Sequence, residues 1–225
     1  MSDTPTQVPF DVPLAFEAIA KSIAPFPKAA MFQLSEDGFS SLWEQLIACV
    51  LSIRTYDEVS GPAAERLFAR ARTPQETLQL TVEEIDALIT PSTYHENKAP
   101  QILEMAQRVV AEYDGTLPAD RDVIMSLRGV GPKCAALSLG IACGQPLISV
   151  DVHVHRVVNR WGIIATKTPE ATMKKLQALL PETLWIDVNR LLMPFGKHLC
   201  TDHLPCCSTC PVLTMCEQRG VTKHR

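Results

Sequence analysis

Helix-start signals recur along this sequence and constrain its fold more than any other feature. A Ser or Thr followed three residues later by Glu forms a capping box, in which each side chain binds the other residue's backbone N–H. Such boxes stand at Ser41–Glu44, Thr73–Glu76 and Thr81–Glu84, and Thr168 followed by Pro169 is a further helix start. Because alternation of apolar and polar residues is rare in the chain, the sequence predicts an all-α fold.

One stretch, Ser149 to His155, departs from this pattern because apolar and polar residues alternate in it. A half-buried β-strand has this alternation. Alternatively, Asp151 caps a helix that continues through Arg156 and Val158. The pattern alone leaves both interpretations open.

The charge of the chain gives two opposing indications about nucleic acid. The 225 residues carry a formal net charge of −4, whereas nucleic-acid binders are usually basic. The segment from Arg121 to Lys167 has six cationic and only two anionic residues, and a local basic face of this kind can bind DNA with a strong salt dependence. No apolar run is long enough to span a bilayer and no secretory leader is recognisable, so we expect a cytoplasmic protein with no membrane partner. We also expect the protein to be a monomer.

The segment Leu127 to Lys133 predicts two short helices joined by a tight turn. Gly129 and Gly131 break the first helix, and Pro132 suits the first position of the second. Exposed backbone N–H groups and the positive end of the second helix would bind phosphate. Lys133 lies in the first turn of that helix, where the dipole favours the neutral amine that nucleophilic attack requires. A plain helical hairpin with a solvated lysine explains this segment equally well.

Five of the eight cysteines lie between Cys200 and Cys216, and four of them have metal-ligand spacing. The four follow the pattern C-x6-C-x2-C-x5-C: Cys200, Cys207, Cys210 and Cys216. Clustered cysteines in a chain without a secretory signal favour a metal over disulfides. Tetrahedral zinc and an iron–sulfur cluster are both compatible with four thiolates. Cys206 interrupts the spacing, and we expect it to be free of metal.

Two segments together resemble the endonuclease III family of DNA glycosylases. Leu127 to Ala135 is similar to the family's helix-hairpin-helix, and Val150 to Val157 is similar to its segment with the catalytic aspartate. The resemblance implies that Lys133 attacks C1′ of the damaged nucleotide, that Asp151 assists, and that Asp151 begins a helix rather than a strand. Gly129 and Gly131 would then contact a DNA phosphate.

The hairpin also departs from the family pattern. Arg128 stands where proline is usual, Pro132 where a basic residue is common, and Cys134 where threonine is usual. None of these differences removes a catalytic group. They concern the phosphate contacts and the rate.

The cysteine spacing resembles the [4Fe–4S] loop of the same family, and this favours iron–sulfur over zinc. In the family such a loop presents basic residues to the DNA backbone, which implies a phosphate contact for Lys197. Two further segments resemble the lesion-contacting loops. In them Arg54, where glutamine is usual, would contact the orphaned base, and Tyr94 or His95 would wedge into the duplex or line the pocket.

The sequence therefore predicts a two-lobed, all-α helix-hairpin-helix DNA glycosylase fold with a C-terminal iron–sulfur loop. One domain would span residues 35–145 and the other residues 1–34 plus 146–225. We expect a bifunctional glycosylase and AP lyase that removes oxidised pyrimidines from double-stranded DNA and acts at abasic sites. A monofunctional adenine glycosylase and a non-catalytic DNA-binding module with a structural metal are the alternatives.

Overall fold

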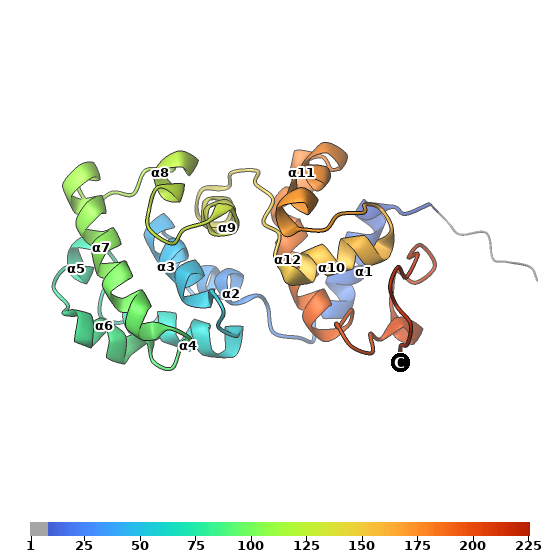
Figure 1. The fold of residues 1–225 in the computed structure, drawn as a ribbon, viewed down its shortest axis with the longest axis horizontal. Coiled ribbons are helices and arrows are strands. Elements are labelled where there is room, and N and C mark those ends of the chain that lie inside the picture. Colours follow the sequence, from blue (N-terminus) through green and yellow to red (C-terminus); the bar gives the residue numbers. More distant parts are fainter. Residues whose placement is uncertain (1–8) are drawn as a thin grey trace, which may run out of the picture. The chain divides into compact units, whose positions relative to one another are not determined.

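The computed structural model describes residues 9–225, and all of its regular secondary structure is helical (Figure 1). The all-α expectation is thereby confirmed. The chain divides into two compact units. The first, here called the cysteine unit, comprises residues up to Lys28 together with Ile148–Arg225, and the second, the hairpin unit, comprises Ala29–Leu147.

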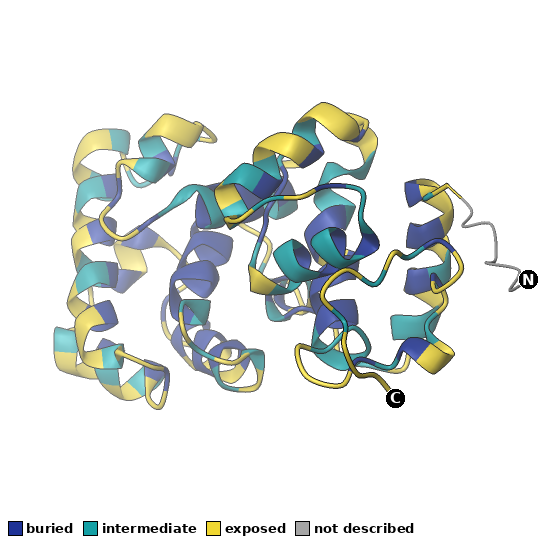
Figure 2. Ribbon diagram, turned by 45° about the vertical axis from the view of Figure 1, so that its right-hand side comes forward, coloured by how far each residue is buried: buried dark blue, intermediate teal, exposed yellow. Residues whose placement is uncertain are grey.

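The hairpin unit contains eight helices in the order of the sequence. They are α2 (Ala30–Glu36), α3 (Leu42–Ser52), α4 (Asp57–Phe68), α5 (Pro74–Thr77), α6 (Val82–Ile89), α7 (His95–Tyr113), α8 (Arg121–Met125) and α9 (Pro132–Cys143). Every residue of α3 from Trp43 to Leu51 is buried, and α3 packs against α4, α7 and α9. Figure 2 shows this burial within the unit. The central helix is thus covered by its neighbours on several faces, which explains why it is apolar around most of its circumference.

The predicted capping boxes are present in the structure. Ser41 with Glu44, Thr73 with Glu76, and Thr81 with Glu84 each show both reciprocal hydrogen bonds. Each cap satisfies backbone N–H groups that have no partner within the helix and contributes about 1 kcal/mol. Short helices such as α5 and α6 depend on these caps together with their packing on α7.

The cysteine unit is formed by segments from both ends of the sequence. Its elements are α1 (Val12–Ile23), α10 (Val152–Trp161), α11 (Pro169–Leu179), α12 (Trp185–His198) and two short 3₁₀ turns, Glu182–Leu184 and Cys207–Thr209. Helix α12 packs against both α1 and α10. Helices α10 and α12 approach closely at Gly196, because a Cβ there would lie 2.8 Å from Cβ of His153.

The stretch from Ser149 to His155 is the start of a helix and not a strand. Asp151 is the N-cap of α10, and its Oδ1 accepts a hydrogen bond from the backbone N–H of Val154 at 2.8 Å. Val154, Val157, Val158 and Trp161 are buried along one face. The helical interpretation is correct because the apolar residues continue at helical spacing beyond the alternating stretch.

The observed division differs from the expected domain boundaries by a few residues. The sequence predicts residues 29–34 in one domain with residues 146–225, whereas α2 begins at Ala30 and packs on α3, α4 and α9 of the hairpin unit. Buried Met31 and Leu34 belong to the core of that unit. Among residues 9–225, no helix combines the length and the apolar character that a bilayer span needs.

Candidate active site and metal centre

The turn between α8 and α9 places Lys133 at the start of a long buried helix. Gly129 has φ +76°, a conformation that few residues other than glycine adopt. Gly131 is the N-cap of α9 and Pro132 occupies its first position, as expected from the sequence. Lys133 follows in the first turn and is partly buried, while Cys134–Gly140 are buried. The lysine therefore sits at the positive end of α9 next to a glycine-rich turn.

Side chains of α7 hold the carbonyl groups of this turn. Gln101 Nε2 donates to the carbonyl oxygen of Arg128 at 2.6 Å, and Arg108 Nη1 donates to that of Ser126 at 2.8 Å. Arg128, exposed at the surface, forms an ion pair with Glu104 at 3.0 Å. The sequence alone does not indicate these supports, because Gln101, Glu104 and Arg108 lie 18 to 27 positions before the residues they bind.

Replacing Gly129 with alanine should destabilise the hairpin. The residue would be strained at φ +76°, and its Cβ would lie 2.5 Å from Nε2 of Gln101, so the support from α7 would shift. We expect the free energy of unfolding to fall by about 1–2 kcal/mol, measured by denaturant titration. Gly131→Ala is the matched control, since Gly131 has no positive φ and a Cβ there meets nothing within 4 Å. Equal losses for both variants would contradict the prediction.

Two buried thiols, Cys49 of α3 and Cys134 of α9, are hydrogen-bonded to each other. This bond and burial raise the pKa of Cys134, whereas the same bond lowers the pKa of Cys49. The positive charge of Lys133 acts on both thiols. Cys134, which departs from the family pattern, is therefore accommodated as a small buried group between α3 and α9.

Asp151 is held at the first turn of α10 by two donors. Its Oδ1 accepts from the N–H of Val154, and its Oδ2 accepts from Nδ2 of Asn189 at 3.5 Å. Asn189 comes from α12 and is buried. Nearby, burial lowers the pKa of His153. Asp151 belongs to the cysteine unit and Lys133 to the hairpin unit.

The structure brings Arg54 and Tyr94 together although they are forty positions apart. Arg54 Nη1 donates to the hydroxyl oxygen of Tyr94 at 3.4 Å, and its guanidinium lies 5.8 Å from the centre of the tyrosine ring. Both residues are exposed, and both have positive φ, 56° and 60°. A positive φ is uncommon outside glycine and occurs often where a functional side chain is presented.

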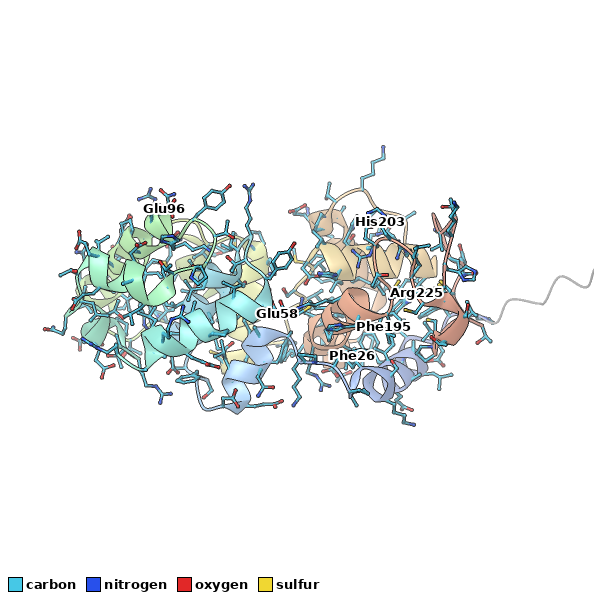
Figure 3. All side chains as sticks on the ribbon, turned by 90° about the horizontal axis from the view of Figure 1, so that it is seen from below. Phe26, Glu58, Glu96, Phe195, His203 and Arg225 are labelled. Carbon is cyan, nitrogen blue, oxygen red and sulfur yellow. The ribbon has the colours of Figure 1, made fainter. Side chains whose placement is uncertain are left out.

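His95, the next residue, has a different environment from Tyr94. Its Nδ1 lies 2.6 Å from Oδ1 of Asp86 and 3.2 Å from Oγ1 of Thr90. Its Nε2 lies 3.6 Å from a carboxylate oxygen of Glu96, which Figure 3 labels. His95 is thus bound within the hairpin unit, while the Tyr94 side chain is 49% exposed.

The four spaced cysteines line one cavity in the cysteine unit. Apolar side chains such as Trp161, Phe195 and Leu213 complete its walls. Burial raises the pKa of Cys210 to about 12, that of Cys216 to about 11, and also the pKa of Cys200. Thiols in such a site bind metal as thiolates, so loading the site releases protons.

The four spaced thiols can be compared with what a single metal ion and a larger cluster each require. Within residues 9–225, no three His, Cys, Asp or Glu side chains converge closely enough to hold a single metal ion. A tetrahedral zinc site needs all its sulfur atoms about 2.3 Å from one centre. A cluster of several iron and sulfide ions is larger and takes its four thiolates from around a common cavity, so the residues present fit such a group.

Cys206 has contacts outside this set. Its Sγ accepts a hydrogen bond from Nε of Arg225 at 3.1 Å, and Figure 3 labels that arginine near the C-terminus. The backbone of Arg225 also bonds to Pro205 and Ser208. Cys206 nevertheless lines the same cavity as the four spaced cysteines, so its exclusion from the ligand set stays a prediction.

Two arginines of α10, which the sequence analysis did not assign, hold the start of the cysteine loop. Arg156 donates to the carbonyl oxygens of Gly196 and Cys200, and Arg160 donates to that of Thr201 at 2.6 Å. Arg160 also reaches Sγ of Cys200 at 3.5 Å. Their spacing of four residues puts them on one face of the helix, and this spacing is the feature of the sequence that could have indicated their shared role. Lys197, the expected phosphate contact, lies in the last turn of α12.

A match to a family model defines the class of protein to which the chain belongs. The family model described as "HhH-GPD superfamily base excision DNA repair protein" matches residues 47–182, which include the hairpin, Lys133 and Asp151. This segment is more than half of the chain.

Similarity to individual proteins identifies the family within this superfamily. Endonuclease III of Thermotoga maritima is 39% identical over 172 residues, covering 76% of this chain and 81% of that protein. Endonuclease III of Escherichia coli is 32% identical, covering 82% and 88%. A solved structure titled as a trapped endonuclease III–DNA covalent intermediate matches with a TM-score of 0.80 and 30% identity, covering 92% and 94%. The chain belongs to the endonuclease III family of base excision DNA repair proteins.

This membership confirms the resemblance inferred from the sequence. The chain is a base-excision-repair DNA glycosylase with AP lyase activity. Neither a monofunctional adenine glycosylase nor a non-catalytic module has comparable support.

Proposed function

We propose that the protein removes oxidised pyrimidines from double-stranded DNA and cuts the strand at the resulting abasic site, with Lys133 as the nucleophile. The observation that carries this proposal is the position of Lys133 in the first turn of α9, directly after the glycine turn. The relative with the covalent DNA intermediate supports it, because a covalent intermediate requires a nucleophile on the protein.

The proposed reaction begins with attack of the neutral Lys133 amine on C1′ of the damaged nucleotide. The nitrogen–C1′ bond forms while the glycosidic bond breaks, and the base leaves with the bonding electron pair and then takes up a proton. Opening of the sugar ring gives an imine between Lys133 and C1′. Loss of a proton from C2′ then expels the 3′ phosphate by β-elimination, and hydrolysis of the imine releases the enzyme.

Asp151 would assist this chemistry as a carboxylate. Its negative charge would stabilise the positive charge that develops on the sugar as the base leaves. It could also accept a proton during ring opening. Its two hydrogen bonds, from Val154 and Asn189, fix the carboxylate orientation before substrate binds.

Arg54 and Tyr94 are proposed to engage the duplex at the lesion. A base flipped out of the stack leaves a gap and an unpaired partner base. The guanidinium of Arg54 can donate hydrogen bonds to that partner, and the tyrosine ring can stack beside it. His95 is assigned to the wall of the same site, because Asp86 and Thr90 already bind its ring.

Phosphate binding is assigned to the hairpin and to Lys197. The turn at Gly129 and Gly131 would present backbone N–H groups to one phosphate, and Lys197 would contact another. Affinity for an abasic-site duplex should therefore fall steeply as the salt concentration rises. We also expect the protein to act as a monomer in the cytoplasm.

The four spaced cysteines are proposed to hold a [4Fe–4S] cluster. When bound, the group would supply a structural crosslink and no open coordination site, since every iron carries a thiolate. The residues Cys200, Cys207, Cys210 and Cys216 would be its ligands, and Arg156 and Arg160 hold the loop around it.

Cys210→Ser should abolish cluster loading, whereas Cys206→Ser should leave it intact. The purified wild type is expected to contain about four iron atoms per chain and to absorb near ~410 nm. Serine at position 210 removes one of the four proposed ligands, whereas Cys206, which also lines the cavity, is not among them and accepts a hydrogen bond from Arg225. Iron analysis and absorbance of both variants measure this. Equal iron in the two, or zinc in the wild type, would refute the assignment.

A panel of damaged duplexes tests the substrate class. We expect product with oxidised pyrimidines and with abasic sites, both followed by strand cleavage. Excision of adenine opposite 8-oxoguanine without strand cleavage would instead establish the adenine glycosylase alternative.

A further inference from the structure

Lys98 is a buried lysine whose donors are all used. Its relative exposure is 4%, and Nζ donates to the carbonyl oxygens of Leu51 at 2.7 Å and Ile53 at 2.9 Å and to Oγ1 of Thr55 at 3.1 Å. Burial lowers its pKa to about 8, and only the nearby thiol of Cys134 opposes this shift. An ammonium group has three N–H donors, so this one is fully satisfied.

The acceptors lie where α3 ends. Leu51 is in the last turn of α3 and Ile53 is its C-cap, so their carbonyl groups belong to the end that lacks helical partners. A positive charge is favourable at this negative end of the helix. The chain then turns at Arg54, the residue with φ 56°. Lys98 therefore fixes the backbone on both sides of Arg54.

Thr55 connects this point to the segment of Tyr94. Its Oγ1 accepts from Lys98 Nζ and also from the backbone N–H of Thr93 at 3.1 Å. Tyr94 follows Thr93, and its carbonyl oxygen accepts from the N–H of Lys98 at 3.0 Å. One network of hydrogen bonds thus joins the neighbours of Arg54 to the neighbours of Tyr94.

We propose that Lys98 is a positioning residue that holds Arg54 and Tyr94 in the arrangement that engages the base opposite the lesion. This inference rests on the proposed role of those two residues in DNA binding. Their contact at 3.4 Å joins two side chains from separate loops, and each backbone has a conformation that is costly without external support.

A buried charge is a poor means of increasing stability compared with an apolar side chain. Its retention here is explained by the directional bonds that it makes to both loops.

The test compares Lys98→Met with the wild type on two abasic-site duplexes. Methionine keeps an unbranched stem but has no N–H donor. One duplex has a normal base opposite the abasic site, and the other lacks a base on both strands, so that no partner base needs to be engaged. We expect the single-turnover cleavage rate of Lys98→Met to fall about tenfold on the first duplex and less than twofold on the second. Gln107→Met, at an exposed position of the same helix, serves as the control.

A spectroscopic readout follows the same step directly. With 2-aminopurine opposite a tetrahydrofuran abasic analogue, the wild type should raise the fluorescence by unstacking the probe, and Lys98→Met should reduce that rise at least threefold at saturating protein. Thr55→Val, which removes the shared acceptor without removing a charge, should act in the same direction and keeps the test valid if Lys98→Met fails to fold.

The outcomes separate this inference from the proposed function. Equal rate losses on both duplexes, or an unchanged fluorescence rise in both variants, would overturn the positioning role of Lys98. Absence of cleavage by the wild type on either duplex would instead overturn the proposed reaction. A loss of cleavage rate that occurs only on the duplex with a base opposite the abasic site supports the positioning role of Lys98.

Discussion

Lys133→Gln is expected to give no borohydride-trapped protein–DNA adduct on an abasic-site duplex and to lose strand cleavage by about 10³-fold or more. Glutamine keeps most of the side-chain length and polarity but has no amine that can form an imine. Because α9 is capped by the backbone turn and packed through Cys134–Gly140, the substitution should leave the fold unchanged. Trapping with borohydride, followed by gel electrophoresis, measures the adduct directly.

Lys174→Gln is the matched control for this experiment. Lys174 is an exposed lysine of α11, so losing its charge should alter adduct formation by less than twofold. Full trapping by Lys133→Gln would show that another amine is the nucleophile. Normal affinity of that variant for a tetrahydrofuran duplex, measured in parallel, would show that the loss lies in the covalent step and not in binding.

Asp151→Asn should lower the glycosylase rate by about 10²–10³-fold, the loss typical when one group that stabilises transition-state charge is removed. Asparagine caps helices as well as aspartate does, so the bond from the N–H of Val154 can persist and the melting temperature should change little. The substitution therefore removes charge while keeping shape. Single-turnover rates on a duplex with an oxidised pyrimidine measure the effect.

Asp11→Asn provides the corresponding control within the same unit. Asp11 is the N-cap of α1 and accepts from the N–H of Leu14 at 2.9 Å, an equivalent local role. Its substitution should leave the glycosylase rate unchanged. If both variants lose stability equally and Asp151→Asn retains full activity, Asp151 is only a helix cap.

Local signals were sufficient to predict much of the fold. The capping boxes gave the starts of α3, α5 and α6, and the glycines with Pro132 gave the start of α9. These features depend on residues within one helical turn, which is why a single sequence reveals them. The stretch before α10 was ambiguous because alternation over a few residues fits a strand as well as a helix start.

Contacts between distant segments could not be predicted in this way. Lys98 looks like an ordinary surface lysine in the sequence, because its acceptors lie more than forty positions earlier. The support of the hairpin by Gln101 and the pairing of Arg54 with Tyr94 also join residues far apart in the sequence, 27 and 40 positions. The placement of residues 29–34 also depended on packing of α2, which the proline-rich flank of that segment did not indicate.

The route of the chain through its two units has a consequence for how the protein is made. The hairpin unit is a continuous stretch, Ala29–Leu147, so it can acquire its core while the ribosome is still translating the remainder. Helix α1, in contrast, is made before the hairpin unit but packs on α12, which is made more than 160 residues later. The cysteine unit therefore completes its core last. The apolar face of α1 stays uncovered until α12 has been made, and the cavity for the proposed cluster forms only after Cys216 has been made.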